Sequence, residues 1–201
     1  MVFIYGAGGH GKVILDIFLE NGVEVGGFFD VKYLDPIRGY PILNFPDNFN
    51  PKLDQLFIGI GNNQHRKRIS QEIKANYINA IHKDSIVSKY AELGEGTVVM
   101  GGALIKTDTF IGKHCIINSN SAIGHDCTLG DFIHIAPGSI LCAGISIGEG
   151  SFIGARSTII PNIKIGKNSM IGAGSVVVSD VPDNVQVVGN PARINKYFEK
   201  I

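Results

Sequence analysis

One aliphatic residue recurs every six positions through the second half of the chain. Every member of this series is Ile, Leu or Val, from Ile81 to Val177. Because a β-strand alternates its two faces every two residues, a period of six predicts short strands joined by regular corners. A fixed period this short is typical of a solenoid, in which each unit stacks on its neighbours. The intermediate members are Val87, Leu93, Val99, Ile105, Ile111, Ile117, Ile123, Leu129, Ile135, Leu141, Ile147, Ile153, Ile159, Ile165 and Ile171.

The same repeat predicts which side chains face the inside of the solenoid. Three strands that return to the same face make a coil of about 18 residues, so residues 81–182 form about 5.7 coils. The aliphatic position points inward, and so does the small residue two places before it. Glycine directly after the aliphatic residue, as at Gly112 and Gly124, is expected to let the backbone turn. The small inward residues are Thr109, Cys115, Ser121, Cys127, Ser139, Ser151, Ser157 and Ser169.

The first 80 residues follow a different pattern, in which apolar runs of strand length alternate with segments of helical spacing. This order predicts a small parallel α/β unit. The unit is Rossmann-like, but it is about half the size of a complete dinucleotide-binding fold. The expected strands are residues 2–5, 23–29 and 56–60, and the expected helices are residues 12–20 and 66–74.

The chain is therefore expected to contain an α/β domain at residues 1–80 and a solenoid domain at residues 81–201. We expect the α/β domain to cover the first end of the solenoid and the proline-containing segment 180–193 to cap the other, because open ends expose unpaired strands. No insertion interrupts the repeat. A functional site must then be built from coil surfaces and neighbouring chains.

Composition excludes several classes of protein. Eighteen basic and 18 acidic residues cancel, which gives no support to a nucleic-acid or anionic-membrane partner. No stretch approaches the ~18 continuous apolar residues needed to span a bilayer, and the N-terminus has no basic leader, so we expect a cytoplasmic protein. Cys115, Cys127 and Cys142 lack zinc-type spacing and are expected to be small core residues.

Three segments together carry a resemblance to a known family. They are the hexapeptide repeats, the ending with Ser-Asp-Val-Pro-Asp (179–183) and Gly-Asn-Pro-Ala (189–192), and the N-terminal Gly-Ala-Gly-Gly-His-Gly (6–11). The chain resembles the hexapeptide acyltransferases over essentially its whole length, specifically the UDP-4-amino-sugar and perosamine N-acetyltransferases and the sialic acid O-acetyltransferases. The resemblance implies a left-handed parallel β-helix, a homotrimer, and acetyl-CoA bound in the groove between adjacent helices.

His125 is the strongest catalytic candidate. It is the third residue of its unit, after Ile123 and Gly124, so its side chain should project from a corner. Acetyl transfer needs a base that accepts the proton of the attacking amine or hydroxyl, and histidine suits this role near neutral pH. The resemblance implies that His125 is this base and that Asp126 orients and polarises its ring. Without the resemblance, a solvated polar corner is the alternative.

The resemblance also implies contacts with acetyl-CoA. His134 precedes the inward Ile135, so by alternation it faces outward, and a matching histidine contacts acetyl-CoA in the family. Ala155 and Ala173 match positions where a small residue lets the pantetheine arm approach closely, with ordinary turn packing as the alternative.

The glycine-rich loop 6–11 suits a phosphate-containing ligand. It fits the pattern GxGxxG, and Asp30 follows Gly11 by nineteen residues, as in dinucleotide-binding folds. It also resembles a P-loop, but Val13 replaces the hydroxyl that binds Mg²⁺, which argues against NTP hydrolysis. Because the domain is half-sized, a nucleotide-sugar diphosphate is the better ligand, and a tight βα turn without a ligand is the alternative.

The family resemblance implies which residues contact this sugar nucleotide. Many family members carry a second acidic residue after the position of Asp30, whereas this chain has Val31, which leaves the nucleobase contact open. The implied contacts are Gly8, Gly9, His10, Asp30 and Gly61.

We therefore expect an acetyl-CoA-dependent N-acetyltransferase that acts on the amino group of a nucleotide-activated amino-dideoxy sugar. Direct transfer in a ternary complex is favoured, because no cysteine occupies an evident catalytic corner. The alternative is O-acetylation of sialic acid or a related sugar, and the intact nucleotide loop favours the N-acetyl interpretation. A non-catalytic β-helix of the ice-binding kind is a weak alternative, because outward threonines are scattered.

A metalloenzyme on this fold would need three imidazoles on one metal. Residues on one face of adjacent coils differ by about 18, and no two histidines of this chain differ by 18 or 36 positions. We therefore expect no metal.

Overall fold

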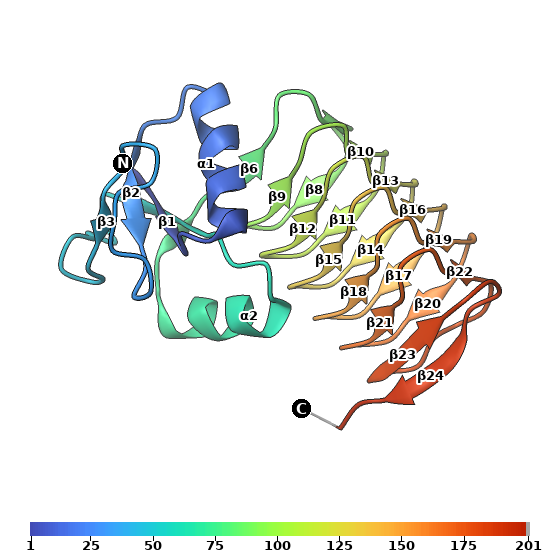
Figure 1. Ribbon diagram of the computed structural model, residues 1–201. Coiled ribbons are helices and arrows are strands. Elements are labelled where there is room, and N and C mark those ends of the chain that lie inside the picture. The colour runs from blue at the N-terminus through green and yellow to red at the C-terminus, as the bar shows by residue number, and fades with distance from the viewer. Residues whose placement is uncertain (200–201) are drawn as a thin grey trace.

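A five-stranded parallel sheet with one helix on each face forms the N-terminal part of the molecule (Figure 1). The computed structural model describes residues 1–199 of the 201. The strand order is β3-β2-β1-β4-β5. The three strands and two helices predicted from the sequence are confirmed, while β3 and β5 are short strands that were not predicted. The elements are β1 (Val2–Tyr5), α1 (Gly9–Glu20), β2 (Val25–Phe29), β3 (Ile42–Leu43), β4 (Gln55–Ile58), α2 (Asn63–Glu72) and β5 (Asn76–Tyr77).

The remaining strands form the expected left-handed parallel β-helix. From β6 to β22 each strand is two residues long, and before the last coil each pairs in parallel with the strand 18 positions further on, as Ile117 pairs with Ile135. The predicted coil length is therefore confirmed. The coils have three flat faces, and successive strands of the chain lie on faces 1, 2 and 3 in turn.

The strands of each face are stacked along the solenoid axis. Face 1 consists of β7 (Ile86–Val87), β10 (Leu104–Ile105), β13 (Ala122–Ile123), β16 (Ile140–Leu141), β19 (Thr158–Ile159) and β22 (Val176–Val177). Face 2 consists of β8 (Glu92–Leu93), β11 (Phe110–Ile111), β14 (Thr128–Leu129), β17 (Ser146–Ile147) and β20 (Lys164–Ile165). Face 3 consists of β6 (Ala80–Ile81), β9 (Val98–Val99), β12 (Ile116–Ile117), β15 (His134–Ile135), β18 (Phe152–Ile153), β21 (Met170–Ile171), β23 (Val185–Val188) and β24 (Arg193–Tyr197).

The aliphatic series forms the core of the solenoid, and every member from Val99 to Val177 is buried. The first member, Ile81, is 37% exposed, contrary to expectation, because no earlier coil covers it. The predicted small residues are buried as well. Their hydroxyls donate to backbone carbonyls, as Ser139 Oγ donates to Gly154 O at 2.8 Å. This hydrogen bond explains how a polar side chain is accommodated in the core.

The glycines after the aliphatic positions have a different role from the one expected. Gly112 and Gly124 do not have a positive φ, so they do not provide the left-handed turn. A Cβ atom on Gly124 would instead lie 2.7 Å from the backbone carbon of Cys142 in the next coil. These glycines are needed because successive coils approach closely. The left-handed conformation falls on later corner residues such as Asp126, with φ of 58°.

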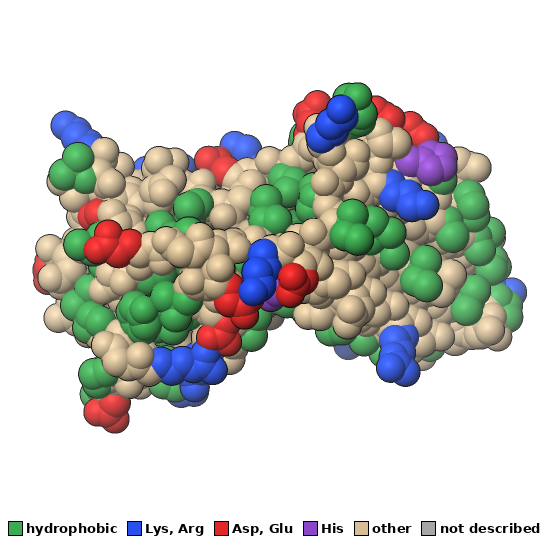
Figure 2. All heavy atoms as spheres, turned by 90° about the horizontal axis from the view of Figure 1, so that it is seen from above, with side chains coloured by type: hydrophobic (Ala, Val, Ile, Leu, Met, Phe, Trp, Pro, Cys, Tyr) green, Lys and Arg blue, Asp and Glu red, His purple; other side chains and the backbone are tan. Residues whose placement is uncertain are grey.

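The α/β domain packs against the flank of the solenoid, and the expectation that it covers the first end is wrong. Ile14 and Ile17 of α1 belong to one apolar cluster with Val98 and Ile116, which point outward from face 3. The flank is therefore a hydrophobic surface that the α/β domain buries. Seen from above, basic and acidic side chains lie side by side where the two parts meet (Figure 2). The predicted boundary at residue 80 falls inside β6.

The other end of the solenoid is capped as expected. Val181, Val185 and Ala192 are buried against the last coil. β23 extends face 3 in parallel, and β24 returns antiparallel beside it. No helix among residues 1–199 is long and apolar enough to cross a membrane.

Helix α2 lies along the corner where face 2 meets face 3. Asn63 donates to the carbonyl of Gly150 at 3.1 Å, and Arg66, three residues later, donates to the carbonyl of Phe132 at 3.3 Å, one coil earlier. Three helical residues rise about 4.5 Å, close to the spacing of ~4.8 Å between neighbouring strands. The helix therefore contacts one coil per turn.

Candidate functional site

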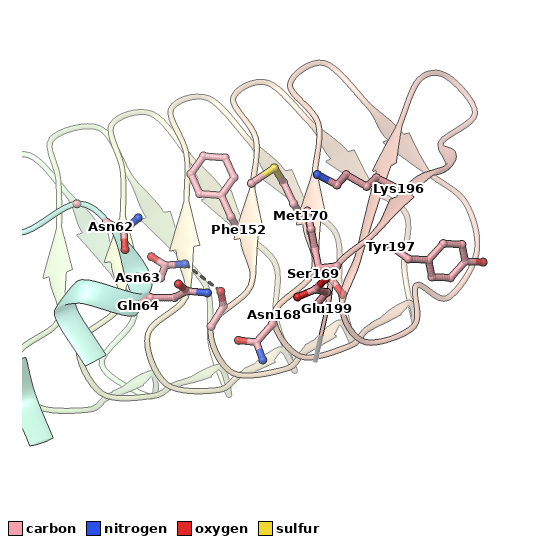
Figure 3. A pocket seen from close by; sticks show the side chains of 13 residues that line it. Asn62, Asn63, Gln64, Phe152, Asn168, Ser169, Met170, Lys196, Tyr197 and Glu199 are labelled. Carbon is pink, nitrogen blue, oxygen red and sulfur yellow. Dashed lines mark hydrogen bonds between the residues drawn. The ribbon is translucent and has the colours of Figure 1, made fainter. Parts of the chain in front are cut away.

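A cleft of about 790 Å³ lies between the start of α2, strands β18 and β21 of face 3, and β24 at the end of the same face (Figure 3). Phe152 and Met170 project into it from adjacent strands of face 3, and Lys196 of β24 points into the same space, whereas Tyr197 points away. Asn63 lies at the opposite wall. The cleft thus has an apolar floor with amide groups, one cation and one carboxylate, Glu199, at its edges, which suits an extended ligand with both apolar and polar parts.

The glycine-rich loop at the start of α1 is open to a ligand. Gly8 is the N-cap of α1, and no side chain among residues 1–199 caps this end. Added Cβ atoms on Gly8 and Gly9 would meet nothing within 4 Å, whereas one on Gly11 would lie 2.0 Å from the carbonyl oxygen of Gly6. Backbone N–H groups at an uncapped helix N-terminus bind phosphate well. The loop thus has the geometry expected of an anion site.

Asp30 holds this loop in place. One carboxylate oxygen accepts a hydrogen bond from the N–H of Ala7 at 2.7 Å, and the other accepts from the N–H of Lys32, also at 2.7 Å. Its carboxylate is therefore already engaged with the backbone. Val31, the next residue, is 96% exposed beside it.

His10 and His134 come together where the α/β domain meets face 3. Burial, then the charge of Arg66 and then His134 lower the pKa of His10 to about 4. Burial and the charge of Arg66 likewise lower the pKa of His134 to about 4, although a hydrogen bond with the Gly61 backbone acts to raise it. Both rings are thus neutral at pH 7. The predicted substrate residues His10 and Gly61 therefore lie beside the predicted acetyl-CoA residue His134.

Neutral imidazoles offer one donor and one acceptor nitrogen. Asn118 Nδ2 lies 3.1 Å from His134 Nε2. His10 Nε2 is buried without a hydrogen-bond partner among residues 1–199. It is therefore available to a bound ligand.

Ala155 and Ala173 occupy the corner where face 3 meets face 1. They lie one coil apart, linked through the Gly174 N–H, which donates to the Ala155 carbonyl at 2.8 Å. This corner borders face 3 on the side opposite α2. The small side chains leave room along the edge of the face that carries His134.

His125 and Asp126 occupy the third corner, where face 1 meets face 2. His125 Nδ1 lies 2.5 Å from Asp126 Oδ2, and the two side chains are 53% and 65% exposed. This corner does not border face 3. One chain therefore does not bring His125 to its own cleft.

Several residues of the site were not predicted from the sequence. Phe152 and Met170 follow His134 by 18 and 36 positions, so a count along the outward positions of face 3 would have found them. Asn118 sits just after the inward Ile117 and had no comparable signal. Arg66 was also missed, because nothing in a helical pattern marks a charged residue as buried.

No group of three or more His, Cys, Asp or Glu side chains within residues 1–199 is arranged to hold a metal ion.

Comparison with known proteins gives matches to both parts of the chain. Residues 1–73 match the PglD N-terminal domain family, and residues 144–179 match the bacterial transferase hexapeptide (six repeats) family. PerB from Caulobacter crescentus, solved with CoA and GDP-perosamine, is 36% identical with a TM-score of 0.91, covering 97% of each chain. The acetyltransferase domain of PglB from Neisseria gonorrhoeae FA1090, solved with acetyl coenzyme A, is 32% identical with a TM-score of 0.93, covering 96% of this chain and 98% of that one.

Two curated relatives are matched over only part of their length. UDP-N-acetylbacillosamine N-acetyltransferase from Bacillus subtilis (strain 168) is 39% identical over 109 residues, which cover 49% of this chain and 50% of that enzyme. The uncharacterized protein L142 of Acanthamoeba polyphaga mimivirus is 35% identical over 119 residues, which cover 58% of this chain and 24% of that protein. The match thus spans half or less of each relative.

Proposed function

This chain belongs to the hexapeptide-repeat sugar N-acetyltransferases, and on that premise we propose that it transfers the acetyl group of acetyl-CoA to the amino group of a nucleotide-linked amino sugar. The observation that carries this proposal is that His10 of the glycine-rich loop and the Gly61 backbone both lie beside His134 of face 3. An anion-binding loop suits the diphosphate of a nucleotide sugar. The solved relatives with GDP-perosamine and CoA support the same pair of substrates.

The proposed reaction needs a base and a proton donor, and His125 supplies both. Its Nδ1 is engaged by Asp126, so Nε2 is the nitrogen that takes the proton. The sugar amine attacks the thioester carbonyl and gives its proton to His125. The C–S bond then breaks, the new amide remains on the sugar, and the CoA sulfur leaves with that proton as a free thiol. Asp126 stabilises the transient imidazolium.

The active site is proposed to be shared between chains of a homotrimer. The outward residues of face 1 are almost all apolar, and Ile140 is 47% exposed, whereas face 2 presents mainly polar side chains. If face 1 surrounds a threefold axis, the His125 corner of one chain meets the Ala155 corner of the next, because these two corners border face 1 on opposite sides. The outward residues of face 1 are Ile86, Leu104, Ala122, Ile140, Thr158 and Val176.

This arrangement brings the two separated halves of the site together. His125 from one chain would approach acetyl-CoA beside His134, Ala155 and Ala173 of its neighbour. The sugar nucleotide would be held by the neighbour's Gly8, Gly9, His10 and Gly61, with Asp30 supporting the loop.

Turnover tests the proposal directly. Purified protein is incubated with acetyl-CoA and a panel of UDP-, GDP- and dTDP-linked amino sugars, with sialic acid included for the O-acetyl alternative, and release of free CoA is measured. We expect turnover with at least one amino sugar, and mass spectrometry should place one acetyl group on its nitrogen. Turnover with sialic acid alone would replace the N-acetyl proposal, and turnover with no acceptor would contradict both.

A further inference from the structure

Arg66 is a buried arginine at the junction of the two parts of the molecule. It is 1% exposed, and within the described residues 1–199 it forms no ion pair with a carboxylate. On the solenoid side, Nε donates to the His114 carbonyl at 2.7 Å and Nη2 donates to the Phe132 carbonyl at 3.3 Å. A buried charge is costly unless its hydrogen bonds are satisfied, so this site is built around a guanidinium.

The other edge of the same guanidinium binds the segment that leads from β4 into α2, which lines the cleft. Nη1 donates to the carbonyls of Ile60 at 3.0 Å and Gly61 at 3.2 Å. Nη2 also donates to Asn63 Oδ1 at 2.8 Å. Gly61 and Asn63 line the cleft. One planar group therefore joins the acceptor side of the site to two successive coils.

We propose that Arg66 is a positioning residue that sets the place of the 60–63 segment, and with it the acceptor sugar, relative to the acetyl-CoA side chains of face 3. The inference rests on the function proposed above. A lysine cannot reproduce this role, because its ammonium has three donors at one point whereas the guanidinium has five in a rigid fork.

The charge of Arg66 has a second effect that can be measured separately from its hydrogen bonds. It faces His10 of α1, His134 of β15, and His114 and Cys115 before β12. After burial, this charge is the next cause that lowers the pKa values of His10, His114 and His134. Glu95 and Asp131 oppose it at His114, where Lys113 adds to it.

Two substitutions separate position from charge. Arg66→Met removes both, and Arg66→Lys keeps the charge but loses the fork. Arg68→Met is the matched control, because Arg68 is on the same helix but exposed, 3.7 Å from Glu72. Steady-state kinetics give KM for each substrate, NMR of labelled histidine gives their pKa values, and hydrogen exchange reports the mobility of residues 60–64.

We expect both Arg66 variants to raise KM for the acceptor sugar by about tenfold to a hundredfold, with KM for acetyl-CoA within about threefold of wild type. Only Arg66→Met should raise the pKa values of His10 and His134. Hydrogen exchange at residues 60–64 should be faster in both Arg66 variants. Arg68→Met should match wild type in KM, histidine pKa values and exchange.

Equal loss for both substrates, or an unchanged acceptor KM in both folded variants, would overturn the proposal. If wild-type protein turns over no acceptor, the proposed function fails by itself. Exchange at residues 60–64 still decides the positioning role in that case, and unchanged exchange in Arg66→Lys, the milder variant, would exclude it.

Discussion

Asp126 lies in the left-handed backbone region, with φ of 58°, and its carboxylate contacts Nδ1 of the preceding His125 at 2.5 Å. The corner geometry thus places the carboxylate beside Nδ1 of the preceding ring and leaves Nε2 without this contact. Such a pair suits a general base that another chain's substrate must reach.

Replacement of His125 by alanine should lower kcat by about 100-fold to 10,000-fold, because the attacking amine then has no positioned base. The side chain is exposed, so the unfolding temperature should stay within about 1 °C of wild type. The exposed His65 of α2 serves as a control in His65→Ala. Undiminished turnover in His125→Ala would remove the assigned base.

Replacement of Asp126 by asparagine should lower kcat by about tenfold to a hundredfold, because the ring loses a charged hydrogen-bond partner. Asparagine tolerates positive φ, so the corner should keep its shape. Steady-state kinetics with saturating acetyl-CoA measure the effect on kcat. A variant as fast as wild type would show that the 2.5 Å contact has no catalytic role.

A shared active site predicts complementation between two inactive chains. His125→Ala removes the base, and Gly9→Glu places a negative charge in the anion-binding loop, where added atoms meet open space. In trimers refolded from an equal mixture, about a quarter of the sites would combine two intact halves. Activity near this fraction of wild type is expected. A mixture of His125→Ala with Asp126→Ala should show no more than the residual activity of Asp126→Ala by itself, and a gain above that level would contradict the shared site.

Replacement of Ile140 by aspartate should separate the proposed trimer into single chains. Three carboxylates around the proposed axis would repel one another and lose solvent, at a cost of roughly several kcal/mol. Size-exclusion chromatography with light scattering measures the mass. Ser146→Asp, on the outward side of face 2, is the matched control and should remain trimeric. A trimeric Ile140→Asp would exclude face 1 as the interface.

Stability should fall as pH drops below neutrality, and His114 should account for part of this fall. Its ring stacks on Phe132 with centroids 5.3 Å apart, and burial lowers its pKa from 6.5 to about 4. The unfolded chain therefore binds a proton before the folded one does, so this contribution is complete above pH 6.5 and is lost as pH falls towards 4.

The test compares unfolding temperatures from pH 7.5 to 4.5 in wild type and His114→Asn, since asparagine also adopts positive φ. The variant should be less stable at neutral pH but should lose less on acidification. His10 and His134 act in the same direction and preserve some dependence. An identical pH slope in both proteins would show that His114 does not titrate in this range.

The repeat predicts the solenoid well because each coil contacts only its neighbours, so local spacing determines global shape. For the same reason it predicts that His125 projects and that His134 faces outward. Docking of the α/β domain could not be predicted in this way. It depends on outward apolar residues such as Val98 and Ile116, which the repeat does not distinguish from other outward positions. It also depends on Arg66 reaching the carbonyls of His114 and Phe132, and backbone carbonyls have no sequence signature.

The two short strands β3 and β5 were missed because two residues cannot show alternation. The role of Gly124 was misjudged for a different reason. A glycine that prevents a clash with the next coil and a glycine that turns the chain look the same in a sequence, and only the distance to Cys142 distinguishes them.

The spacing of residues along α2 nearly matches the spacing of the coils, but the two are not equal. A helix gains about 4.5 Å in three residues while the coils advance by ~4.8 Å, so the two drift apart by about 0.3 Å at each step. Contacts hold at Asn63 and Arg66, but a much longer helix would lose its alignment. Whole coils inserted beyond Gly150 would therefore lengthen the solenoid without disturbing the docked domain, whereas a coil inserted between Phe132 and Gly150 would break the alignment.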